Sequence, residues 1–422
     1  MSITNTATSP NPRTVSAAGG APLAAMHHAL DGAASPLPHD RRERLLAAPL
    51  TAVTFAAVPV AATPAVLELS VADAAVAADD TEALAAALQT GSASTSAAPA
   101  GASAGGCSLA VTMLASRGIA LGDLVAVLGH LNAFPSRLHV LAIRSLSDPA
   151  APAVTALDVV VAADAAAAGT DLVPLLRGYL RQIETARAVD IAVQRDSVFR
   201  RHKRLFVFDM DSTLIQQEVI DQIAAHAGVG DRVSRITESA MRGEIDFTES
   251  LRRRVALLKS LPASTLDVVR EIITFSPGAK DLCRALKRLG CKMAVVSGGF
   301  IPLAKYVQAT LGLDFAHANG LAVSADGAHL TGETYGPIVD GRRKAELLVQ
   351  IAAEHGIPHD QVVAVGDGAN DLLMMGAAGL GIAYNAKPKV QEQAAARINQ
   401  PSLLNVLHIM GLSWAEIQEL LA

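Results

Sequence analysis

Aromatic side chains, cysteines and any excess of one charge are scarce in this 422-residue chain. Phe, Trp and Tyr make up 3% of the residues, and there is a single tryptophan. Three cysteines (Cys107, Cys283 and Cys291) are too few for a disulfide framework, and no pair has zinc-site spacing. The net charge of −5 excludes a polycation built to bind nucleic acid. These scarcities predict a protein of a reducing compartment, the cytoplasm, without a nucleic-acid partner.

Lysine is missing from the first 202 residues, and all nine lysines lie at or beyond Lys203. Alanine has the opposite distribution, with 51 of the 81 alanines in residues 1–200. The two halves therefore differ in kind, and a chain of this length is expected to hold two or three domains. The basic run 200–204, where the composition changes, is typical of a solvated linker.

Residues 1–40 are rich in Pro, Gly, Ser and Ala, which predicts a disordered tail; a transit peptide is the alternative. Residues 41–106 predict a small degenerate domain, with strands at 50–60 and 65–72 and a helix at 79–89. A Gly/Ser/Ala linker at 91–106 ends it. The uncharged stretch 45–67 is long enough to span a bilayer, but it holds three prolines (Pro49, Pro59 and Pro64). We therefore predict no membrane span.

Residues 107–196 alternate strand and helix patterns in the order βαββαβ. The predicted strands are 108–114, 137–145, 154–162 and 189–194, and the helices are 121–131 and 171–186. This order predicts a ferredoxin-like α+β sandwich and resembles the ACT regulatory domains. The turn 115–118 lacks the acidic residue typical of ACT ligand sites, which favours a packing module over an amino-acid sensor. A homodimer formed through this domain is a hypothesis that rests on the order alone.

From residue 205 onward the pattern changes to short apolar strands separated by helices. Strands are predicted at 205–208, 292–297 and 361–365, and helices at 280–289 and 344–354. Such alternation predicts an α/β fold with a doubly wound parallel sheet. In such sheets ligands bind at the carboxyl ends of the strands, and each of these strands is followed there by polar residues.

Four aspartates follow two of these strands: Asp209, Asp211, Asp367 and Asp371. Four carboxylates in one crevice repel each other and require a cation, and oxygen ligands without His or Cys favour Mg²⁺. Ser297 ends the predicted strand 292–297, and the backbone N–H groups of Gly298 and Gly299 beside it can bind a phosphate. Lys344 adds a positive charge at a predicted helix start. Carboxylates, Mg²⁺ and phosphate donors together predict phosphoryl transfer.

These residues resemble the four motifs of the haloacid dehalogenase superfamily. The motifs are DMDST at 209–213, Ser297, Lys344 and GDGANDL at 366–372, and the resemblance covers about 205–400. A finer resemblance is to the phosphoserine phosphatase family, through FDMDSTLIQQEVID (208–221), RRRVALLKSL (252–261), VVSGGF (295–300) and GDGANDLLMM (366–375). The resemblance implies a Mg²⁺-dependent hydrolysis of O-phospho-L-serine to serine and phosphate, the last step of serine biosynthesis.

The resemblance also implies roles for these positions. Asp209 attacks phosphorus and forms an aspartyl-phosphate, and Asp211 acts as the general acid and base. The Mg²⁺ ligands are Asp209, the Asp211 backbone carbonyl and Asp367, with Asp371 in support. Ser297, Lys344 and backbone N–H groups bind the phosphoryl group, and Asn370 positions the constellation.

Substrate choice is expected in a helical cap at about 216–275 within the predicted phosphatase domain 203–422. By resemblance Glu218 binds the substrate ammonium and Arg254 its carboxylate. Met241 and Phe247 line the pocket, while Gly299 allows close backbone approach. Neighbours on a helix are about 100° apart, so the three arginines 252–254 cannot all face one cleft, and one can bind substrate while the others are solvated.

Two alternatives stay open at this stage. A phosphatase or phosphotransferase for another small phosphate would share the four motifs. Alternatively, the chain could act mainly as an amino-acid-responsive regulatory binder, although intact catalytic motifs argue against a pseudo-enzyme.

Overall fold

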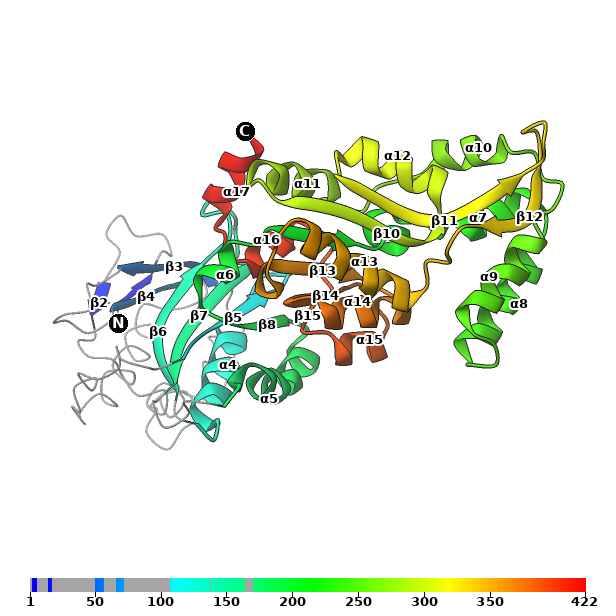
Figure 1. The fold of residues 1–422 in the computed structure, drawn as a ribbon. Helices are drawn as coiled ribbons and strands as arrows, with labels where there is room; N and C mark the ends of the chain where they lie inside the picture. The colour runs from blue at the N-terminus through cyan, green and yellow to red at the C-terminus, as the bar shows by residue number, and fades with distance from the viewer. Residues whose placement is uncertain are drawn as a thin grey trace. The chain divides into compact units, whose positions relative to one another are not determined.

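The computed structural model describes residues 2–5, 14–16, 50–56, 66–71, 107–136, 138–163 and 170–422 (Figure 1). The chain divides into two compact units. The first comprises residues 1–201 with Leu407–Glu419, and the second comprises His202–Val406 with Leu420–Ala422. No helix in these ranges has the length and apolar character needed to cross a bilayer.

The first unit contains a four-stranded antiparallel sheet with two helices. Its elements are β5 (Ser108–Leu114), α4 (Leu121–Ala133), β6 (Leu138–Ser145), β7 (Ala156–Ala163), α5 (Leu172–Arg187) and β8 (Asp190–Arg195). The strand order is β6-β7-β5-β8, with β5 antiparallel to both neighbours. Alternate β5 residues Leu109, Val111 and Met113 enter the core shared with both helices. The elements follow the predicted βαββαβ order, whereas the resemblance to ACT domains stays a prediction.

The start of the chain holds four further strands: β1 (Ser2–Asn5), β2 (Thr14–Ser16), β3 (Leu50–Ala56) and β4 (Val66–Val71). They form a sheet in the order β2-β1-β4-β3. The strands β1 and β2 lie within the tail that the composition predicted to be disordered. In the structure β1 pairs with both β2 and β4, and local composition does not reveal such partners. The predicted linker 91–106 and helix 79–89 lie outside the described residues.

The segment Leu407–Glu419 belongs to the first unit, although the predicted phosphatase domain ran to residue 422. The Gln194 side chain donates to the Ile409 carbonyl at 2.8 Å, and the Trp414 amide donates to the Leu146 carbonyl at 2.7 Å. The segment includes most of α17 (Trp414–Leu421), whose Ile417 is fully buried. These hydrogen bonds fasten the segment to the rest of the first unit, which the local pattern did not predict.

Arg200 is buried, although its place in a basic run predicted a solvated linker residue. It lies in the short helix α6 (Val198–Arg201), and its side chain is 1% exposed. Its Nη2 donates to both oxygens of Asp158, a fully buried residue of β7, at 2.8 and 2.9 Å. The reason for the difference is that Asp158 is a buried charge, which requires a buried partner.

The second unit is built on a seven-stranded sheet in the order β12-β11-β10-β9-β13-β14-β15. Its strands are β9 (Leu205–Phe208), β10 (Lys292–Phe300), β11 (Phe315–Val323), β12 (Leu330–Tyr335), β13 (Val362–Gly366), β14 (Leu380–Tyr384) and β15 (Ala396–Ile398). Every neighbouring pair is parallel except β11 with β12. The first strand, β9, lies between β10 and β13, so the chain order reverses there. This reversal is where such sheets bind ligands.

Helices cover both faces of this sheet (Figure 1). Leu205 and Val207 of β9 face a core with α13 (Gly341–Glu354) and α14 (Leu372–Ala377). The alternate residues Phe206 and Phe208 are also fully buried, which is typical of a parallel strand covered on both sides. The helices α11 (Ala279–Arg288) and α12 (Ile301–Leu311) pack on β10.

A four-helix cap is inserted between β9 and β10. Its helices are α7 (Val219–His226), α8 (Gly230–Met241), α9 (Phe247–Ala256) and α10 (Thr265–Ile272). An isolated antiparallel bridge between Ile215 and Phe275 joins its entry and exit. The Gln217 side chain also donates to Thr274 Oγ1 at 2.6 Å and accepts from the Thr274 amide at 3.0 Å. The segments that enter and leave the cap are therefore hydrogen-bonded to each other.

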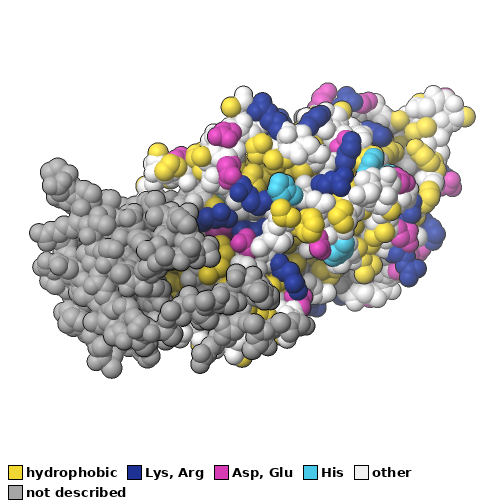
Figure 2. Space-filling model, turned by 60° about the vertical axis from the view of Figure 1, so that its left-hand side comes forward, with side chains coloured by type: hydrophobic (Ala, Val, Ile, Leu, Met, Phe, Trp, Pro, Cys, Tyr) yellow, Lys and Arg dark blue, Asp and Glu magenta, His cyan; other side chains and the backbone are white. Residues whose placement is uncertain are grey.

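On the face shown in Figure 2, Lys and Arg side chains are interspersed with Asp, Glu and apolar side chains. Mixed charge of this kind is typical of an ordinary solvated surface.

Candidate active site

Asp209 lies at the carboxyl end of β9, where the chain leaves the sheet. It is 5% exposed, and its Oδ1 accepts from the Met210 amide at 2.7 Å. A tight turn over Met210–Leu214 follows, in which Ser212 has a left-handed φ of 54°. The turn brings Thr213 Oγ1 within 3.2 Å of Asp367 Oδ1, so that the end of β9 is tied to the end of β13.

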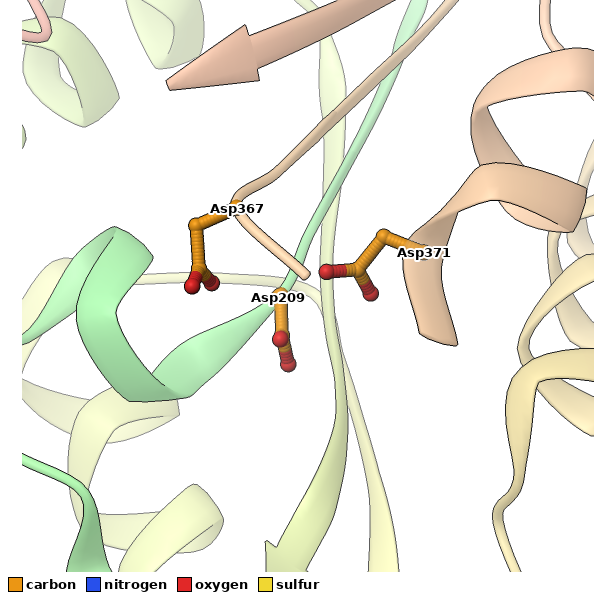
Figure 3. A group of neighbouring side chains, drawn as sticks. All are labelled: Asp209, Asp367 and Asp371. Atoms are coloured by element: carbon orange, nitrogen blue, oxygen red, sulfur yellow. The ribbon is translucent and has the colours of Figure 1, made fainter. Parts of the chain in front are cut away.

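Three of the four predicted aspartates form a compact group. One carboxylate oxygen from each of Asp209, Asp367 and Asp371 lies within 4.8 Å of the others. Figure 3 shows these side chains around the ends of β9 and β13. Oxygen ligands from three carboxylates fit a hard divalent cation such as Mg²⁺. The Asp211 carboxylate is not in this group, and its predicted ligand role through the backbone carbonyl stays a prediction.

Lys344 lies in the first turn of α13 and is fully buried. Its Nζ is 2.7 Å from Asp209 Oδ1 and 2.7 Å from Asp371 Oδ1. Burial by itself would lower the pKa of Lys344, but the charges of Asp209 and Asp371 outweigh it and raise the pKa. The ammonium therefore stays charged beside the group of aspartates.

Even with Lys344 present, burial and mutual repulsion disfavour the ionised form of these carboxyl groups. Burial, then the charge of Asp371, raises the pKa of Asp209 well above its usual range. Burial, then the charges of Asp371 and Glu218, raises the pKa of Asp367 to about 7. A divalent cation would favour the ionised forms of these groups. The donor set and its electrostatics both fit the predicted metal.

Asp211 has a different environment from that of Asp209. Its Oδ2 lies 3.4 Å from the Val219 amide, and its buried Oδ1 has no hydrogen-bond partner among the described residues. Burial, followed by the charge of Glu218, raises the pKa of Asp211 well above its usual range. A carboxyl group with a raised pKa holds its proton to higher pH and can give it to a leaving group.

The turn after Ser297 brings a hydroxyl and two glycines to the same end of the sheet. Ser297 is fully buried, and its Oγ accepts from the Gly299 amide at 2.8 Å. A Cβ on Gly299 would lie 3.0 Å from Met210 Cε and 3.0 Å from a Val219 methyl, so the backbone approaches closely here. Phe247 of the cap lies 3.0 Å from where a Cβ on Gly298 would be, which places its ring over this turn.

The two predicted recognition charges lie in the cap and its entry. Ser212 Oγ donates to Glu218 Oε1 at 2.7 Å, which holds Glu218 beside the turn after β9. Arg254 Nε is 3.4 Å from the Ser250 carbonyl. Burial lowers the pKa of Arg254, and the charges of Asp221, Glu218 and Asp211 oppose this effect. Arg254 and Glu218 therefore lie within electrostatic reach of Asp211.

The neighbours of Arg254 point elsewhere. Arg252 and Arg253 both pair with Glu249, at 2.8 and 2.7 Å, and their side chains are 71% and 54% exposed. This is the arrangement that the 100° spacing predicts.

The structure gives fewer contacts for two further predicted site residues, Met241 and Asn370. Met241 ends α8, and its side chain is outside the described residues. Asn370 lies in the turn before Asp371, with its carbonyl oxygen 2.7 Å from the position of a Cβ on Gly341. The predicted roles of Met241 and Asn370 stay predictions.

Two residues at the site were missed by the sequence reasoning. Thr213 is part of the DMDST motif, but it was not predicted to be a site residue. Asn319 of β11 is fully buried; its Nδ2 donates to the Gly298 carbonyl and its Oδ1 accepts from the Val339 amide, both at 2.8 Å. Asn319 pairs with Phe300, the last residue of β10, so a polar residue in the strand beside β10 was the available signal.

Comparison with known proteins agrees with this geometry. The model of the haloacid dehalogenase-like hydrolase family matches residues 203–379. A probable phosphoserine phosphatase of Schizosaccharomyces pombe is 51% identical over 240 residues, which are 57% of this chain and 80% of that protein. The chain belongs to the phosphoserine phosphatase family. The matched hydrolase region, 203–379, includes the Asp209 turn, the cap and the remaining predicted motifs.

Another curated relative and two solved structures are also similar to this chain. The Streptomyces coelicolor phosphoserine phosphatase is 51% identical over 259 residues, 61% of this chain and 62% of that protein. A solved HAD family hydrolase of Salmonella enterica serovar Typhi has a TM-score of 0.60 at 30% identity, covering 72% of this chain and 98% of that chain. A probable phosphoserine phosphatase of Vibrio cholerae has a TM-score of 0.52 at 33% identity, covering 74% and 88%. The predicted haloacid dehalogenase-like fold is confirmed.

Proposed function

We propose that this chain hydrolyses O-phospho-L-serine to L-serine and phosphate. Two observations carry the proposal in this member of the phosphoserine phosphatase family: Glu218 accepts from Ser212 in the turn after Asp209, and Arg254 lies within electrostatic reach of Glu218 and Asp211. A carboxylate and a guanidinium on one side of a phosphate site suit a substrate with an ammonium and a carboxylate. A sugar phosphate carries neither group.

In the proposed reaction, a carboxylate oxygen of Asp209 attacks phosphorus and the bond from phosphorus to the serine oxygen breaks. Asp211 gives its proton to that oxygen, and the raised pKa of Asp211 keeps the proton available. Asp211 then takes a proton from the water that hydrolyses the aspartyl-phosphate. Free serine and phosphate result, and both carboxyl groups return to their starting states.

Lys344 and the Ser297 turn are proposed to bind the phosphoryl oxygens. Lys344 is fixed by two aspartates 2.7 Å away, so its charge needs no rearrangement during the reaction. Asp209, Asp367 and Asp371 would hold Mg²⁺, which when bound supplies positive charge that stabilises the transferring phosphoryl group. The cap, with Phe247 above the Gly298 turn, would exclude water.

A substrate panel with and without Mg²⁺ tests the proposal. We expect phosphate release from phosphoserine to exceed that from phosphothreonine and from sugar phosphates, and to stop when EDTA removes the metal. The alternative of another small phosphate is favoured if a different compound has the highest kcat/KM. Activity that survives EDTA would contradict the Mg²⁺ requirement.

Arg254→Ala is expected to lower kcat/KM for phosphoserine roughly 10- to 100-fold, the loss of a charged hydrogen bond. Phosphoethanolamine lacks the carboxylate, so its smaller kcat/KM is expected to change little. The matched control is Arg253→Ala, because Arg253 is exposed and pairs with Glu249. An equal loss on both substrates would contradict the role of Arg254 in carboxylate recognition.

We also propose a place in serine biosynthesis within the cytoplasm, which three free cysteines suit. A homodimer through the β5–β8 domain is a further proposal, resting on its βαββαβ order. Light scattering of the full chain tests the dimer, and a monomeric mass at micromolar concentration would contradict it.

A further inference from the structure

We propose that Asn319 is a positioning residue that sets the orientation of the phosphate-binding Ser297 hydroxyl and links it to the helix that carries Lys344. The inference rests on the proposed phosphate-binding role of Ser297 and Lys344. The observation behind it is independent of that role: one fully buried amide makes two 2.8 Å hydrogen bonds to two different backbone segments of the site.

The first contact controls one peptide plane. Asn319 Nδ2 donates to the Gly298 carbonyl, and the same peptide unit ends in the Gly299 amide, which donates to Ser297 Oγ at 2.8 Å. The carbonyl and the N–H of a trans peptide point in opposite directions in one plane. By holding the carbonyl, Asn319 therefore aims the N–H at Ser297 Oγ.

The consequence falls on the Ser297 hydroxyl. An oxygen that accepts from the Gly299 amide uses a lone pair and keeps its own hydrogen for donation. That hydrogen is the one available to a phosphate oxygen. Without Asn319, the Gly298–Gly299 peptide can rotate, because both residues are glycines and have few steric limits. The Ser297 hydroxyl would then lose its fixed direction.

The second contact reaches the segment before α13. Asn319 Oδ1 accepts from the Val339 amide, and the next residue, Asp340, caps α13 by accepting from the Arg343 amide at 2.8 Å. Lys344 follows in the first turn of that helix. A single side chain thus sets the spacing between the two groups proposed to bind phosphate. Preorganised donors of this kind contribute more than mobile ones, because they need no reordering when the ligand binds.

Three variants separate this positioning role from a merely structural one. Asn319→Ala removes both contacts. Asn319→Asp keeps an acceptor for the Val339 amide but places a second acceptor against the Gly298 carbonyl. The near-isosteric Asp variant keeps the test possible if the Ala variant fails to fold. Asn399→Ala is the control, because Asn399 contacts Gln391 at the surface of the same unit.

The first readout is the affinity for inorganic phosphate, measured by calorimetry with Mg²⁺ present. We expect about tenfold weaker binding in both Asn319 variants, the loss of about one well-formed hydrogen bond, and no change in Asn399→Ala. Unchanged phosphate affinity in a folded Asn319 variant would overturn the inference. This readout does not use phosphoserine, so it is decided separately from the proposed substrate.

The second readout is a double-mutant cycle with Ser297→Ala. If Asn319 acts through the Ser297 hydroxyl, the double variant binds phosphate about as weakly as Ser297→Ala alone. A double variant whose loss is the product of the two single losses would show that Asn319 acts independently, and the inference would be wrong.

Discussion

Asp209→Asn is expected to reduce phosphate release roughly 10⁴-fold or more, the size of effect seen when an enzyme loses its nucleophile. The substitution leaves an amide oxygen, which is a poor nucleophile. Among the described carboxylates, only Asp209 lies at the end of β9, contacts Lys344 directly and belongs to the three-aspartate group. Asp371 also contacts Lys344, but its Oδ2 accepts from the Gly368 amide at 3.0 Å, so both of its oxygens are engaged.

The same variant is expected to fold as well as the parent or better. The amide oxygen that replaces the carboxylate can still accept from the Met210 amide and from Lys344. The substitution also removes a carboxylate whose pKa is raised by burial and by Asp371, so one repulsion disappears. The thermal midpoint therefore distinguishes lost chemistry from lost structure. The control is Asp326→Asn, an exposed aspartate in the turn between β11 and β12. Normal turnover in Asp209→Asn would remove Asp209 as the nucleophile.

The meeting of Asp209, Asp367 and Asp371 could be predicted because it follows from chain topology. Parallel strands end at one edge of the sheet, so the aspartates after β9 and β13 had to meet, and the order of the strands is enough to bring them together. The contacts of Asn319 could not be predicted in this way. Its partners, the Gly298 carbonyl and the Val339 amide, are 21 and 20 residues distant, and only the packed loops bring them together.

The same limit explains the errors at the ends of the second unit. A basic run such as 200–204 is hydrophilic by composition, yet Arg200 is buried because Asp158, 42 residues earlier, is buried. The apolar positions in Leu407–Glu419 indicated burial but not the surface that buries them. Local pattern predicts that a side chain is covered, whereas its partner depends on tertiary structure.

Asp158→Ala is expected to lower the free energy of unfolding of the first unit by about 3–5 kcal/mol. Asp158 is fully buried and accepts from Thr112 Oγ1 at 2.8 Å, from Arg144 Nη2 at 2.8 Å and from Arg200 Nη2. The Arg200 side chain is 1% exposed, so removing the carboxylate leaves a buried guanidinium without its closest counter-charge.

The contacts that Arg200 would keep are weak substitutes. Its Nε donates to the Ile409 carbonyl at 3.2 Å and its Nη2 to Thr112 Oγ1 at 2.9 Å, and both acceptors are neutral. The carboxylate of Asp196 is 3.7 Å away and its side chain is 35% exposed, so water screens it more than it screens Asp158.

The single tryptophan makes this measurement specific. Trp414 lies in Leu407–Glu419, the segment that belongs to the first unit, so its fluorescence during urea unfolding reports on that unit.

Arg195→Ala is the control, because the Arg195–Asp171 pair is 59% and 60% exposed and is expected to contribute about 0–1 kcal/mol. In Asp158→Ala/Arg200→Met the stranded charge is gone, so the double variant is expected to be more stable than Asp158→Ala. If instead the double variant is the less stable, the loss comes from packing, and the buried ion pair is not what Asp158 supplies.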